Sequence, residues 1–202
     1  MVQKIMVPPY FGPISCWKQI INSTILWDVH QNYIKQTYRN RTFIHSANGL
    51  QKLTVPVKHS KIKFSMLEAK IDNTIAWQKN HWRSIQTAYS SSPFFEFYKD
   101  SLEQVYNKKY TYLVKFNFDM IKLVFEWLDI EIKLKLSKEY KFVYDDSLDL
   151  RKKIDNKAFD IEISDGDDDE DFKEYSVIFD LNFVSIFINY KTKTVKNFTI
   201  FS

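Results

Sequence analysis

The first part of the chain has two short apolar runs separated by a segment with helical spacing of its hydrophobic residues, and this pattern predicts a β-α-β unit. Residues 4–7 are a short apolar run that ends at a proline pair, and residues 24–29 form a second run. Between them, hydrophobic residues recur at the three- and four-residue spacing of a helix: Ile14, Trp17, Ile20 and Ile21. This order predicts a parallel strand pair with a right-handed crossover. Ligands in such units bind at the carboxyl ends of the strands.

Alternating residues further along predict a hairpin and additional strands. Thr42–Ser46 and Gln51–Val57 alternate on either side of Asn48-Gly49, which is a strong turn signal. The same alternation or a β-branched composition predicts strands at Lys61–Ala69, Glu131–Leu136, Tyr140–Tyr144 and Tyr175–Ser202.

Helical spacing dominates the middle of the chain. We expect helices at Trp77–Ser90, Phe94–Leu102 and Tyr110–Leu128. The last has the clearest buried face: Leu113, Phe116, Met120, Val124 and Leu128. The predicted fold class is α/β, with a mixed β-sheet opened by the β-α-β unit. A hairpin is inserted, a helical segment at about 74–128 packs on the sheet, and strands follow at the C-terminus. We predict one domain over residues 1–202.

Composition narrows the functional classes. Only three glycines are present among 202 residues, so the sequence contains neither the glycine-rich dinucleotide-binding motif nor the P-loop motif. One cysteine allows no internal disulfide and no cysteine-built zinc site. The N-terminus lacks the apolar core of a signal peptide, and no apolar run is long enough to span a bilayer. We therefore expect a cytoplasmic location.

Charge is distributed unevenly along the chain. Residues 160–174 hold nine acidic residues and one lysine, whereas residues 1–63 hold Asp28 against nine lysines and arginines. The basic part favours an anionic partner, although lysines spread over solvated faces explain part of the excess. The acidic run at 165–171 could hold a cation, but its spacing does not fit a calcium loop, and a solvated loop at about 160–174 is the simpler interpretation.

Two segments carry the candidate chemistry. His30–Arg41 interleaves cations with tyrosines and amides, and Lys79–Phe95 combines a histidine, an arginine and amides on one expected helix. Arginine forks match phosphate or carboxylate oxygens, so Arg41, Arg83 and Lys35 are candidate anion ligands. Both segments must meet in space for these residues to form one pocket.

Four pieces in sequence order resemble the WbqC-like protein family: PYFGPISCWKQIINS, NYIKQTYRNR, ANGLQKLTVPVK and WQKNHWRSIQTAYSSSPFF. The resemblance covers about residues 4–130. These bacterial proteins are encoded among surface-polysaccharide (O-antigen) genes, and the resemblance implies a transferase that adds glycine or a similar acyl group to an amino sugar or nucleotide-linked sugar. The tail at about 175–202 departs from the family, because it lacks the Gly-Phe-x-Pro-Asn-Leu-Ser pattern.

Carried over position by position, the resemblance implies a site with these substrate-binding residues: Tyr10, Lys35, Asn40, Arg41, Asn80, Arg83 and Tyr89. His81 is the candidate catalytic base, since an unperturbed imidazole titrates near pH 6.5. Cys16 is an alternative nucleophile without a spacing that ties it to His81. His30, His45, His59 and His81 lack the spacing of metal ligands, so no metal is predicted, and no cofactor can be named.

Three functions remain open at this point. The first is a sugar-modifying acyl or aminoacyl transferase whose substrate is a phosphate- or nucleotide-linked sugar. The second is a non-catalytic module that binds an anionic sugar or nucleotide. The third is nucleic-acid binding, which would weaken steeply as the salt concentration rises.

Overall fold

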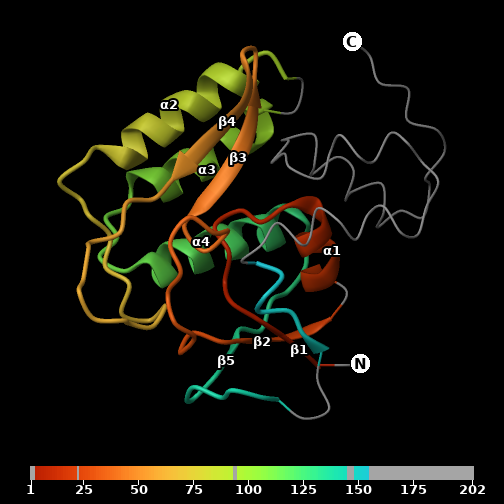
Figure 1. Cartoon of the computed structure of the whole chain (residues 1–202). Coiled ribbons are helices and arrows are strands. Elements are labelled where there is room, and N and C mark those ends of the chain that lie inside the picture. The colour runs from red at the N-terminus through yellow and green to blue at the C-terminus, as the bar shows by residue number, and fades with distance from the viewer. Residues whose placement is uncertain (1–2, 22, 93–94, 145–147, 155–202) are drawn as a thin grey trace.

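The computed structural model describes residues 3–21, 23–92, 95–144 and 148–154 (Figure 1). The acidic loop expected at 160–174, with its possible cation site, and the strands expected in Tyr175–Ser202 lie outside these residues.

The N-terminal residues form the centre of a parallel sheet. Strand β1 (Gln3–Met6) is followed by helix α1 (Ile14–Ile21) and strand β2 (Thr24–Trp27), and β1 pairs with β2 in parallel from Gln3 opposite Thr24. Two short strands complete the sheet, β5 (Lys135–Leu136) beside β2 and β6 (Leu148–Asp149) beside β1, in the order β5-β2-β1-β6. The expected β-α-β unit is confirmed, and it supplies the two inner strands.

The hairpin is also confirmed, with its turn one residue earlier than the sequence suggests. Strands β3 (Arg41–Ser46) and β4 (Gly49–Thr54) pair antiparallel, from Arg41 opposite Thr54 to Ser46 opposite Gly49. The turn is therefore Ala47-Asn48, and Gly49 opens β4 with φ of +92°. Glycine adopts this region without the steric cost that a Cβ brings, so it can close the hairpin as the first strand residue.

Three helices form the middle of the molecule: α2 (Trp77–Tyr89), α3 (Phe95–Asn107) and α4 (Leu113–Trp127). The apolar face expected for α4 is buried as predicted. In Figure 1, α4 runs between the parallel sheet and the layer that holds α2, α3 and the hairpin. Its aromatic side chains contact both sides, since Phe118 lies edge-on to Trp27 of β2 at 5.8 Å and Phe116 lies edge-on to Trp77 of α2 at 5.0 Å between ring centroids.

Two expected strands are wrong, and one is shorter than expected. Lys61–Ala69 and Tyr140–Tyr144 are irregular, and Glu131–Leu136 contributes only β5. The backbone of the first segment bonds to several separate parts of the chain rather than to one neighbour. Phe64 accepts from the Tyr33 N–H, Leu67 donates to the carbonyl of Val29, and Ala69 accepts from Leu113 N–H. A segment that changes partner every few residues satisfies its backbone without forming a strand.

Candidate functional site

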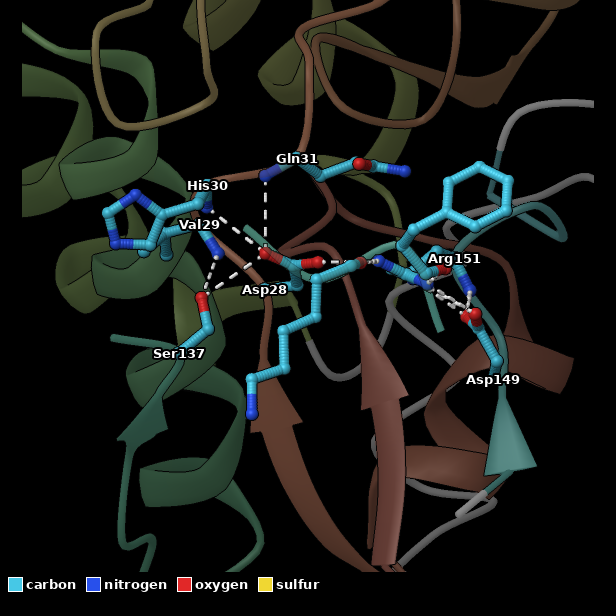
Figure 2. A network of polar contacts seen from close by, with 9 residues as sticks. Asp28, Val29, His30, Gln31, Ser137, Asp149 and Arg151 are labelled. Carbon is cyan, nitrogen blue, oxygen red and sulfur yellow. Dashed lines mark hydrogen bonds and ion pairs between the residues drawn. The ribbon is translucent and has the colours of Figure 1, made fainter. Parts of the chain in front are cut away.

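The carboxyl edge of the parallel sheet gathers polar side chains from distant parts of the sequence (Figure 2). Asp28 follows β2, Ser137 follows β5, and Asp149 ends β6 with Arg151 two residues beyond. Because parallel strands point the same way, their carboxyl ends meet at one edge, which is where open α/β sheets bind ligands.

Asp28 is the centre of this edge, and its side chain is completely buried. One carboxylate oxygen accepts from the backbone N–H groups of His30 (3.1 Å) and Gln31 (3.2 Å) and from Ser137 Oγ (3.2 Å). The other accepts from Arg151 Nη1 at 2.9 Å. A buried carboxylate keeps its charge only when it is paired and hydrogen-bonded in this way.

Every nitrogen of the Arg151 guanidinium group donates hydrogen bonds to other groups of the protein. Nε and Nη2 bind the Asp149 carboxylate, with a shortest distance of 2.6 Å, and the backbone carbonyls of Lys141 and Phe142 accept at 2.7 and 2.9 Å. Partial burial acts to raise the pKa of Asp149, but the hydrogen bonds from Arg151 outweigh it and the pKa is lowered. These contacts hold strand ends together and leave no guanidinium nitrogen for a ligand.

A second cluster lies on the chain that leaves this edge, and it contains Tyr33, Arg39 and Arg41. Burial raises the pKa of Tyr33 to about 12, while the positive charges of Arg39 and Arg41 act in the opposite direction. Burial likewise lowers the pKa of Arg39 to about 10, against the attraction of Tyr33 and Asp28. Two guanidinium groups therefore stand within electrostatic reach of one phenol.

Arg41 and Thr54 face each other at the open end of the hairpin, as directly paired residues of β3 and β4. Paired residues present their side chains on the same face of the ladder. Arg41 Nε and Thr54 Oγ1 are both shielded from solvent, and neither has a hydrogen-bond partner among the described residues. A buried donor without a partner is costly, so this pair of atoms is a candidate ligand site.

His81 lies in the core beside the same hairpin end. Its Nδ1 is 3.0 Å from the hydroxyl of Tyr10, which is itself 2.7 Å from the hydroxyl of Tyr106. Burial lowers the pKa of His81 to about 4, and a hydrogen bond to the backbone of Thr54 acts in the opposite direction. The neutral imidazole has one N–H, which donates to the backbone of Thr54. Nδ1 therefore accepts a hydrogen bond from the Tyr10 hydroxyl, and that hydroxyl in turn accepts from Tyr106.

The sequence-predicted site residues differ in how deeply they are buried. Tyr10, Asn40, His81 and Tyr89 are buried, whereas Lys35, Asn80 and Arg83 are exposed and Arg41 is half-buried. Thr54 links Arg41 and His81, because it pairs with the first and its backbone bonds to the second, whereas Arg83 lies on the exposed side of its helix.

Several predicted binding residues are held by the protein itself. Asn40 donates to the carbonyl of Val55 at 2.9 Å and accepts from the backbone of Gln36 at 3.1 Å. The hydroxyl of Tyr89 accepts from the backbone of His45 at 3.2 Å. Burial raises the pKa of Cys16, so its thiol is not an activated nucleophile.

Sequence reasoning missed Thr54, Ser137, Asp149 and Arg151 as partners at this edge. One signal was available, since Asp28 is the only acidic residue in the basic first 63 positions and follows an expected strand.

Within the described residues, no three His, Cys, Asp or Glu side chains cluster in a way that could hold a metal ion. In the same part of the chain, no helix has the length and apolar character needed to cross a membrane.

Comparison with known proteins gives two matches. The model of the WbqC-like protein family matches residues 8–194, well past residue 130 and into the tail that departs from the expected pattern. The chain is also similar to the uncharacterized protein Rv1507c of Mycobacterium tuberculosis, with 32% identity over 149 residues, or 70% of this chain. The matched region spans 60% of that relative's length. No solved structure matches.

Proposed function

This chain belongs to the WbqC-like protein family, and from that premise we propose that it binds an anionic small molecule, of the class of a phosphate- or nucleotide-linked sugar, at Arg41 and Thr54. The observation that carries the proposal is the pair of shielded atoms, Arg41 Nε and Thr54 Oγ1, without a partner in the described residues. One ligand oxygen between them would accept from the guanidinium and from the hydroxyl together.

The surrounding charge supports an anion. Arg39 and Arg41 act on the same phenol of Tyr33, and Asp28, the carboxylate that acts on Arg39, is engaged by Arg151. Exposed Lys35 lies on the same connecting segment and extends the positive potential toward solvent. A positive field of this kind raises the local concentration of an anionic ligand and speeds its association.

Transfer of glycine or another acyl group to an amino sugar, as part of surface-polysaccharide synthesis, is the second candidate. The favouring observation is that His81 hydrogen-bonds to the backbone of Thr54, next to the proposed anion site, and is unprotonated at neutral pH. In such a transfer the sugar amine forms a bond to the acyl carbon, and the bond from that carbon to its carrier breaks. The amine proton passes to the Tyr10 hydroxyl, which gives its own proton to His81 Nδ1. The carrier departs with the electron pair.

One set of measurements distinguishes the two candidate functions, anion binding and acyl transfer. We expect a nucleotide sugar or inorganic phosphate to raise the melting temperature of the wild-type protein, because a ligand that binds only the folded state stabilises it. Arg41→Gln should weaken that binding about tenfold, a loss of about 1.4 kcal/mol. Lys79→Gln is the control, since Lys79 is also a cation but is exposed on α2, away from the buried face that carries His81.

Equal binding by the wild-type and Arg41→Gln proteins would refute the anion site. For transfer, His81→Gln should abolish amide formation while ligand binding by Arg41 is retained. Absence of turnover with every acyl donor tested, alongside intact binding, would leave the protein as a binding module.

A further inference from the structure

We propose a second anion site, for a ligand that carries two or more phosphate groups, where the loop before α4 meets the exposed face of that helix. Two neighbouring cavities of about 590 and 580 Å³ open there, and Lys115 lines both. Lys108, Lys109 and Lys122 line the first cavity, and Lys70 lines the second. Volumes of this size hold small organic ligands. Neither cavity is lined by Arg41 or Thr54, so the proposal is independent of the function proposed above.

The carboxylates in these cavities are already engaged. Asp119 is 3.4 Å from Lys108 Nζ and accepts from the Tyr110 hydroxyl at 2.9 Å. Glu68 accepts from the backbone and the hydroxyl of Ser65, at 2.9 and 2.7 Å. The ion pairs among the described residues do not include Lys109, Lys115 or Lys122.

The arrangement of the lysines favours a ligand with several charges. Lys115 and Lys122 lie seven residues apart and so on one face of α4, with Asp119 between them. Lys70 stands over the ring of Tyr112 at 6.0 Å, on the other side of Lys115. Like charges gathered around two hollows repel one another, and a polyphosphate would neutralise them. Lysine ammonium groups bind phosphate as point charges that adapt to its geometry.

The test uses inorganic tripolyphosphate as the probe and isothermal titration calorimetry near physiological salt. The protein is the 202-residue chain carrying Arg41→Gln, so that the first site is disabled. We expect binding to persist in this background. Adding Lys115→Gln and Lys122→Gln should weaken it at least tenfold, which two lost phosphate contacts readily account for. Adding Lys61→Gln and Lys63→Gln, two exposed lysines outside both cavities, should change it less than about twofold.

Three outcomes would overturn the proposal. Tripolyphosphate could fail to bind the Arg41→Gln protein, which would place all anion binding at the first site. The control pair could weaken binding as much as the cavity pair, which would indicate attraction to a generally basic surface. A single-stranded oligonucleotide could bind more tightly through the same two lysines, with a steep salt dependence, which would make nucleic acid the partner. All four lysines are exposed, and thermal melting checks that each variant remains folded.

Discussion

Arg151 donates from Nη1 to Oδ2 of Asp28 at 2.9 Å, although 123 positions separate the two residues. Both side chains are almost fully buried. Since β1 lies between β2 and β6 in the sheet, this ion pair bridges the carboxyl end of the central strand.

Breaking this pair from one side should be costly. We expect Arg151→Met to lower the free energy of unfolding by about 3–5 kcal/mol, because it leaves the Asp28 charge buried without its partner. The double variant Asp28→Asn, Arg151→Met should lose less than the sum of the two single changes. Urea denaturation measures each value, and Lys152→Met, an exposed neighbour, serves as the control. Additive losses would show that the pair is energetically uncoupled.

The stability should depend on pH through His81. Its pKa is lowered to about 4 in the folded protein from 6.5, so between these values the unfolded chain binds more protons. Stability from this group is therefore complete above about pH 6.5 and is lost as the pH falls toward 4, by up to about 3 kcal/mol. His81→Gln removes this contribution while keeping hydrogen-bonding groups. The difference between wild-type and variant unfolding free energies at pH 7 and pH 5 tests it, and an equal pH response in both would contradict it.

The hydroxyl of Tyr10 should contribute to stability beyond the packing of its ring. Tyr10→Phe removes the group that joins Tyr106 to His81 and leaves His81 Nδ1 buried without a donor. We expect a loss of about 1–3 kcal/mol. Chemical denaturation should show a lower midpoint with an unchanged slope. Tyr140→Phe, at a residue that is 49% exposed, should have little effect.

The hairpin turn should be sensitive to one glycine for a backbone reason. A Cβ at Gly49 would meet nothing within 4 Å, yet φ is +92° there. Gly49→Ala should therefore cost about 1 kcal/mol through conformation alone. Gly49→Asn should cost less, because asparagine tolerates positive φ better. Asn48→Ala in the same turn is the thermal-melting control, and an equal effect of both alanine substitutions would exclude the conformational explanation.

Local pattern was sufficient for the elements that bury one continuous face. The β-α-β opening, the hairpin and helix α4 follow from spacing that neighbouring residues set, and the described structure contains them. The alternation in Lys61–Ala69 was misleading, because alternate burial also occurs in a segment that bonds to a succession of different partners.

The polar edge could be predicted only in part. Asp28 stands out in a basic stretch, but nothing near Arg151 in the sequence indicates that it reaches back to Asp28. No strand was expected at Leu148–Asp149, which forms β6 because β1 offers an open parallel edge. The burial of the His81 side chain likewise depends on Tyr10 and Tyr106, which come from other parts of the chain.

The order of the strands has a consequence for synthesis of the chain. The inner strands β1 and β2 are made first, and their outer neighbours β5 and β6 follow more than a hundred residues later. Ribosomes add about 5–20 residues per second, so the Asp28 carboxylate is made on the order of ten seconds before the arginine that neutralises it. During this interval the nascent chain has two unprotected strand edges, which is when chaperone binding would do most to prevent its aggregation.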